Sequence, residues 1–193
     1  EQIVSSHHNV HGAGELTMIQ DIEAKIVNHL INNNLQKNTI TSISTHDIKI
    51  ILDQYISELQ RYSNSAIHII DKLPYNYLKI GLIKSLLPNA KIIYCRRNPI
   101  DVCVSIFFQN FSADSQDTLL DLAHQNNKTN NNHNWGLNAF SFNLIDIGKY
   151  YLDHERIMTH WKDIYHNEIY EIQYEELVQK QEEKSKELID FIG

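Results

Sequence analysis

Two arginines and a serine form the segment of this 193-residue chain that is best suited to bind an anion. Arg96 and Arg97 end an apolar run, Pro99 follows, and Ser105 comes eight residues after Arg97. Proline favours the first turn of a helix, where its missing amide hydrogen costs nothing. An arginine at a strand end can bind phosphate through two hydrogen bonds, and a serine two turns into the helix can donate a third. The alternative is a local ion pair of Arg97 with Asp101 or another acidic neighbour, with Ser105 as an ordinary small helix residue.

The hydrophobic pattern predicts the elements that position this segment. β-Branched and aromatic runs predict three buried strands, at 66–71, 91–96 and 169–174. Helical spacing or capping residues predict six helices, at 15–34, 45–59, 76–87, from Pro99, at 144–165 and from Glu175. This alternation predicts one α/β domain over residues 1–193, with a parallel sheet covered by helices on both faces. A ligand is then expected beyond the carboxyl ends of the strands, at 71–72, 96–101 and 174–175.

The amino-acid composition limits which kinds of molecule the chain is expected to bind. The net charge is −7, which does not favour broad attraction to nucleic acid or to an anionic membrane, so an anionic ligand must be held by a few local groups. No apolar run approaches the roughly 20 residues that a membrane-spanning helix needs. Cys95 and Cys103 are too few for a disulfide framework, and we expect two reduced core thiols and a cytoplasmic protein.

Three motifs resemble one enzyme family, in matching order and spacing. The segment Arg97-Asn-Pro-Ile-Asp-Val-Cys-Val-Ser105 resembles the 3′-phosphate motif of sulfotransferases that use 3′-phosphoadenosine-5′-phosphosulfate. Residues 71–91 resemble the preceding segment in bacterial sulfotransferases, including those fused to tetratricopeptide repeats, which are similar to tyrosylprotein sulfotransferases. Residues 174–178 resemble the family's Tyr-Glu-x-Leu-Val segment. The resemblance covers essentially the whole chain.

This resemblance implies a three-layer α/β/α fold of the P-loop nucleoside-triphosphate-hydrolase type and a role for each matching residue. Arg97 and Ser105 would bind the 3′-phosphate, and Tyr174 would approach the adenine. Glu15 aligns with the general base of tyrosylprotein sulfotransferases, which takes the proton of an acceptor hydroxyl. Lys72 matches the lysine that neutralises charge on the leaving phosphate. The alternatives are that Glu15 is a helix N-terminal acid and that Lys72 is a solvated surface residue.

The stretch from Ser5 to Glu15 also resembles the family, but the loop that precedes it in relatives is absent from this chain. That Gly/Ser/Thr-rich loop cradles the 5′-phosphosulfate with its backbone amides at a helix N-terminus. Residues 12–14 do not replace it, because they follow a helix tail instead of opening a helix. We therefore expect a fragment of a sulfotransferase domain that lacks the phosphosulfate loop and the extreme C-terminus and is inactive alone.

Other functions remain open at this point. His7, His8 and His11 with Glu15 fit no zinc spacing, so no metal is expected. A non-catalytic binding module that keeps the fold is one alternative. A P-loop kinase-like enzyme with Asp71 as its Mg²⁺ ligand is another. The acceptor is expected to carry a hydroxyl group, with a protein or peptide tyrosine as one candidate. The polar loop predicted at 112–134 would select it, and the sequence does not specify the oligomeric state.

Overall fold

The computed structural model describes residues 1–32, 44–109 and 139–193, and the loop predicted at 112–134 lies outside these residues. The chain divides into two compact units. Unit 1 contains residues 1–92 and 181–193, and unit 2 contains residues 93–180.

Unit 1 is built around a pair of parallel strands, β1 (Val10–Gly12) and β2 (His68–Ile70), with Val10 opposite His68 and Gly12 opposite Ile70. The pairing continues past the strands, because Lys72 N–H donates to the Gly14 carbonyl at 2.8 Å. The helices of the unit are α1 (Gln2–Ser5), α2 (Met18–Asn32), α3 (Thr45–Tyr62), the 3₁₀ helix η2 (Pro74–Lys79), α4 (Ile80–Leu86) and α9 (Gln181–Ile192).

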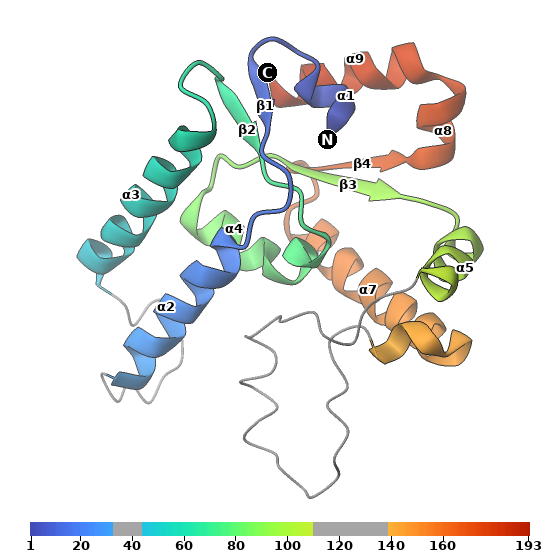
Figure 1. Ribbon diagram of the computed structural model, residues 1–193, viewed down its shortest axis with the longest axis horizontal. Coiled ribbons are helices and arrows are strands. Elements are labelled where there is room, and N and C mark those ends of the chain that lie inside the picture. The colour runs from blue at the N-terminus through green and yellow to red at the C-terminus, as the bar shows by residue number, and fades with distance from the viewer. Residues whose placement is uncertain (33–43, 110–138) are drawn as a thin grey trace, which may run out of the picture. The chain divides into compact units, whose positions relative to one another are not determined.

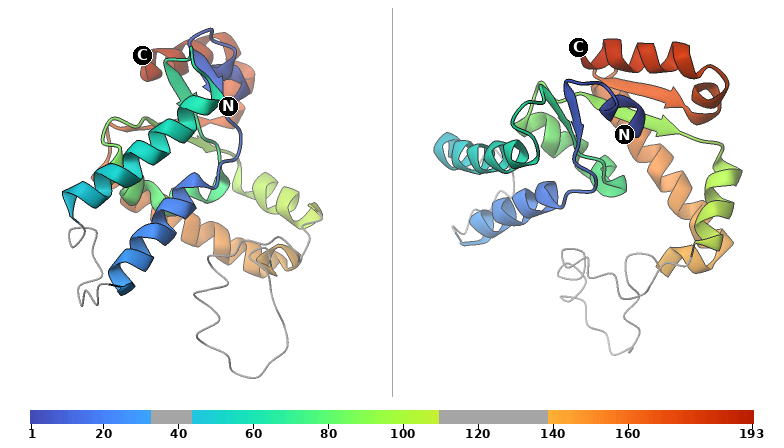
Figure 2. Two further views of the ribbon diagram at one scale, coloured as in Figure 1. Left: turned by 60° about the vertical axis from the view of Figure 1, so that its left-hand side comes forward. Right: turned by 45° about the horizontal axis from the view of Figure 1, so that its top comes forward.

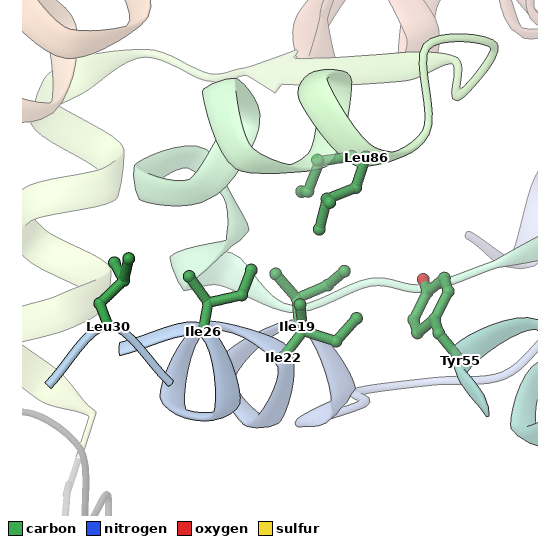
Figure 3. Close-up of a cluster of buried hydrophobic side chains, with 7 residues drawn as sticks. Ile19, Ile22, Ile26, Leu30, Tyr55 and Leu86 are labelled. Atoms are coloured by element: carbon green, nitrogen blue, oxygen red, sulfur yellow. The ribbon is translucent and has the colours of Figure 1, made fainter. Parts of the chain in front are cut away.

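The core of unit 1 lies where α2, α3 and α4 meet. Figures 1 and 2 show α2 and α3 side by side, joined at the surface by a hydrogen bond from Lys25 Nζ to Gln54 Oε1 at 3.2 Å. One stripe of α2 is buried at helical spacing against the neighbouring helices, as Figure 3 shows. Each fully buried aliphatic side chain of this kind contributes about 1.5–3 kcal/mol. The members of the cluster are Ile19, Ile22, Ile26, Leu30, Tyr55, Ile83 and Leu86.

Unit 2 also holds a pair of strands, β3 (Ile92–Arg96) and β4 (Ile169–Gln173), whose arrows point the same way in Figure 1. Its helices are α5 (Pro99–Phe108), the 3₁₀ helix η3 (Ala139–Phe142), α7 (Leu144–Ile164) and α8 (Tyr174–Gln179). The 21-residue α7 packs against both α5 and η3 and buries Ile147 and Met158. The stacked rings of Phe140 and Tyr150, with centroids 3.9 Å apart, fix η3 on α7.

The predicted α/β class is confirmed at this level: helices and short strands alternate, and parallel pairing is present. A single central sheet in three layers stays a prediction. Cys95, predicted to be a core thiol, is exposed. Within the described residues, every helix is too short or too polar to cross a membrane.

Candidate functional site

Glu15 and Lys72 form an ion pair in unit 1, although 57 residues separate them in the sequence. Glu15 lies in the turn between β1 and α2, and Lys72 lies just beyond β2. Because the two strands are parallel and in register, their carboxyl ends bring both residues to the same edge. The side chains of Lys72 and Glu15 are 47% and 54% exposed, so both stay accessible to a ligand.

The backbone beside this pair holds Glu15 in place. Gly14 has φ +76°, a left-handed conformation that glycine adopts without strain, and it turns the chain away from β1. The Leu16 N–H then donates to Asp71 Oδ1 at 3.4 Å. Burial raises the pKa of Asp71, and the bond from Leu16 opposes that effect. Glu15 is therefore held between two residues that are each bonded to the segment following β2.

Arg97 and Tyr174 meet in unit 2. The Arg97 guanidinium lies over the Tyr174 ring, with Cζ 5.3 Å from the ring centroid, which is within the range of a cation–π contact. Arg97 follows β3 and Tyr174 follows β4, so this pair also lies at the carboxyl ends of two neighbouring strands. The side chain of Arg97 is 44% exposed and Tyr174 is 42% exposed. An exposed cation beside an exposed ring can bind an anionic group joined to an aromatic one.

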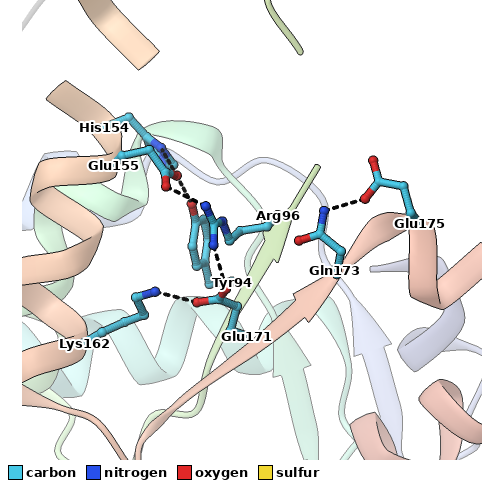
Figure 4. Close-up of polar contacts among 8 residues, drawn as sticks. All are labelled: Tyr94, Arg96, His154, Glu155, Lys162, Glu171, Gln173 and Glu175. Carbon is cyan, nitrogen blue, oxygen red and sulfur yellow. Dashed lines mark hydrogen bonds and ion pairs between the residues drawn. The ribbon is translucent and has the colours of Figure 1, made fainter. Parts of the chain in front are cut away.

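The neighbouring Arg96 is held by carboxylates of its own unit (Figure 4). Its guanidinium donates to Glu155 at 2.7 Å and to Glu171 at 3.2 Å. Tyr94 also donates to Glu155, and Lys162 donates to Glu171 at 2.6 Å. The bond to Glu171 raises the pKa of Arg96, so this cation is fixed between β4 and α7. The structure thus separates two adjacent arginines into a structural one and an accessible one.

Ser105 lies on the same face of α5 as Asp101, and both side chains are exposed. The predicted helix start at Pro99 is confirmed, and the Asn98 side chain caps it by accepting the Ile100 N–H at 2.9 Å. Seven residues separate Asn98 from Ser105, which is about 10 Å along the helix axis. Ser105 is therefore offset from the Arg97–Tyr174 contact, with Asp101 between them.

The local ion pair that the sequence left open is present in a weak form. Arg97 Nη2 lies 4.0 Å from Asp101 Oδ2, at the outer limit for an ion pair, and both groups are exposed. Exposed pairs at this helical spacing contribute only about 0.3–0.5 kcal/mol. Such a contact leaves Arg97 able to bind a stronger anion.

The sulfotransferase family model matches residues 1–193. The chain belongs to the sulfotransferase family. An uncharacterized protein of Aquifex aeolicus (strain VF5) is 34% identical over 200 residues, which covers 99% of this chain and 23% of that protein. The sulfotransferase chain thus spans less than a quarter of the length of this relative. No solved structure matches it.

The structure of the sulfotransferase chain brings four of the five predicted site residues together in two pairs, Glu15 with Lys72 and Arg97 with Tyr174. Their roles stay predictions. The residues predicted not to bind metal, His7, His8 and His11, form no group of three metal ligands with other described residues. Sequence reasoning missed Glu155 and Glu171, the partners of Arg96. No local signal could have found Glu155, because it lies 59 residues further along the chain.

Proposed function

We propose that this sulfotransferase chain provides part of an enzyme that moves a sulfuryl group from 3′-phosphoadenosine-5′-phosphosulfate to an acceptor hydroxyl. The observation that carries the proposal is the accessible Arg97 guanidinium over Tyr174, next to an Arg96 that its own unit already neutralises. An accessible arginine that has only a weak ion pair, beside an aromatic ring, matches a nucleotide that carries a phosphate near its base. Sulfuryl transfer is the general chemistry of the family.

Each pair has a distinct role in this proposal. Arg97 and Ser105 bind the 3′-phosphate, and Tyr174 borders the adenine. Glu15 accepts the proton of the acceptor hydroxyl while the acceptor oxygen bonds to sulfur. Lys72 stabilises the negative charge on the phosphate oxygen from which sulfur departs, and adenosine 3′,5′-bisphosphate leaves. The ion pair between Glu15 and Lys72 supports these assignments, because it holds a base and a cation at one place.

The subgroup of the family, the complete fold and the acceptor are part of the same proposal. We assign the chain to the bacterial subgroup that is fused to tetratricopeptide repeats and is similar to tyrosylprotein sulfotransferases, with a P-loop-type three-layer fold. A glutamate base fits a hydroxyl acceptor, and a protein or peptide tyrosine is one candidate. The cytoplasmic location stays a prediction from the sequence.

Binding of adenosine 3′,5′-bisphosphate to the full-length protein tests the donor site. We expect the ligand to raise the melting temperature, since a ligand at 100 times its Kd stabilises the folded state by about 2.7 kcal/mol. Arg97→Ala should weaken binding by about 10- to 100-fold, the cost of losing charged hydrogen bonds. Arg156→Ala is the matched control, because Arg156 of α7 is an exposed arginine with a weak acidic partner, Asp153 at 3.4 Å. Equal losses in both variants would sink the assignment of Arg97.

A transfer assay separates the enzyme from its rivals. The full-length protein should transfer sulfate to a tyrosine peptide in the presence of a chelator, because no step uses Mg²⁺. Mg²⁺-dependent turnover of ATP would instead support the kinase-like alternative, in which Asp71 binds the metal ion. If the protein binds nucleotide but turns over neither 3′-phosphoadenosine-5′-phosphosulfate nor ATP, the remaining alternative is a non-catalytic binding module.

A further inference from the structure

Glu175 joins the two turns that carry Arg97 and Tyr174. Its Oε1 accepts the backbone N–H of Asn98 at 2.8 Å, across 77 residues of sequence. Its Oε2 accepts the side-chain amide of Gln173, the last residue of β4 (Figure 4). One carboxylate on α8 therefore binds both the start of α5 and the end of β4.

The neighbours of this bond are the residues of the proposed donor site. Asn98 directly follows Arg97, and Glu175 directly follows Tyr174. Asn98 is itself fixed, because its side-chain oxygen caps α5 through the N–H groups of Ile100 and Asp101. A change in the Glu175 contact therefore shifts the backbone next to both members of the 5.3 Å cation–π pair.

We propose that Glu175 is a positioning residue that holds Arg97 and Tyr174 in the geometry that binds the donor nucleotide, an inference that rests on the proposed function. The N–H of Asn98, and after it the Gln173 side chain, lowers the pKa of Glu175, so the carboxylate is ionised at neutral pH. A charge-assisted bond of this kind is stronger than a neutral one and restricts both turns. Glu175 acts through its neighbours, since a carboxylate touching a phosphate would repel it.

The inference distinguishes Glu175 from Glu176, the next residue of the same helix. Both are acidic residues in the first turn of α8, and removing either changes the net charge equally. If charge alone mattered, Glu175→Ala and Glu176→Ala would change binding of an anionic nucleotide by the same factor. If position matters, only Glu175→Ala weakens binding.

Calorimetry with adenosine 3′,5′-bisphosphate on the full-length protein tests the inference. We expect Glu175→Ala to weaken binding by about 5- to 20-fold. Glu175→Gln should stay within about threefold of the unchanged protein, because its amide oxygen still accepts the Asn98 N–H. Glu176→Ala should stay within about twofold. The kcat at saturating donor should change less than about twofold in Glu175→Ala, since the residue acts on donor affinity.

A double variant decides whether Glu175 works through Arg97. Glu175→Ala in an Arg97→Ala background should cost clearly less affinity than in the unchanged protein, because only the position of Tyr174 is then left to lose. Fully additive losses, or no loss in Glu175→Ala alone while Arg97→Ala weakens binding, would overturn the inference and leave the proposed function standing. Absence of nucleotide binding by the unchanged protein would overturn both together.

Discussion

Lys72 in unit 1 and Arg97 in unit 2 are both cations at the carboxyl ends of strands, but what faces them differs. Lys72 is in contact with a carboxylate of its own unit, Glu15. Arg97 faces an aromatic ring. Its carboxylate neighbours are Asp101, which is 4.0 Å away, and Glu175, which already accepts hydrogen bonds from Asn98 and Gln173. The charge of Lys72 is therefore compensated before a ligand arrives, whereas most of the charge of Arg97 is available.

Because of this difference, Arg97 should contribute to the affinity for the donor, and Lys72 should contribute to the catalytic step of the proposed enzyme. An uncompensated cation contributes to binding of the donor in its ground state. A cation paired with a base contributes when the pair is opened, as the base takes a proton and the cation meets the charge that develops in the transition state. Changes in unit 1 should therefore act on kcat, and changes at Arg97 should act on donor affinity.

The largest effect is expected from breaking the Glu15–Lys72 pair. Glu15→Gln and Lys72→Ala should each lower kcat by about 10²- to 10⁴-fold, the usual range for a general base or a charge-stabilising group, and change the Kd of adenosine 3′,5′-bisphosphate less than about threefold. Unit 1 offers a matched control in the ion pair of Glu23 with Lys79. Glu23→Gln should reduce stability without a comparable loss of kcat in the same transfer assay, and a comparable loss would contradict the roles of Glu15 and Lys72.

The second effect concerns the two adjacent arginines. Arg96→Ala removes the partner of Glu155 and Glu171, leaving two partly buried carboxylates without their bridge, so we expect the free energy of unfolding to fall by about 1–3 kcal/mol. Arg97→Ala should change it by less than about 0.5 kcal/mol. Urea unfolding of both variants measures the contrast. Equal decreases in the free energy of unfolding in the two variants would show that Arg96 is not the structural arginine of the pair.

These arginines also show what the sequence could predict. Helical periodicity and Pro99 located the elements, and the rule for parallel sheets pointed to the strand ends at 71–72, 96–101 and 174–175. However, a run of apolar residues without alternation does not show which side chains of the strand lie on the covered face and which on the exposed face. In β3 exposure alternates, so Tyr94 and Arg96 lie on the more covered face while Cys95 is exposed. The roles of Arg96 and Cys95 therefore required the structure.

Short elements and long-range pairs were harder to predict. The strand β1 is only three residues long and ends in glycine, so no alternating pattern marks it. The helix predicted from Asn76 starts earlier, at Pro74, because proline favours a first helical turn, and its first part is 3₁₀. The helix predicted to begin at 45 does begin there, and Ser44 caps it with a hydroxyl that accepts the Asp47 N–H at 3.1 Å.

Asp71 supplies a smaller test, inside unit 1. Its pKa is raised by burial, so ionised Asp71 destabilises the folded state above that raised pKa, and this cost vanishes below the unfolded value of about 3.9. Asp71→Asn keeps an oxygen for the Leu16 N–H and removes the charge. We expect it to raise the free energy of unfolding by about 1 kcal/mol at pH 7, with the gain shrinking toward pH 4. A gain that is constant over this range in urea titrations would show that the charge is not its cause.

The smallest effect is expected at Asp101, the weak partner of Arg97. If most of the Arg97 charge is already available, removing its weak partner should tighten binding of adenosine 3′,5′-bisphosphate only about two- to fivefold in Asp101→Asn, which corresponds to about 0.4–1 kcal/mol. The gain should decrease in 0.5 M salt, because exposed charges are screened. By contrast, Glu15→Gln frees the paired Lys72 and should increase binding of inorganic sulfate by a larger factor. Calorimetry that gave Asp101→Asn the larger gain would mean that Arg97, not Lys72, is the more strongly compensated cation.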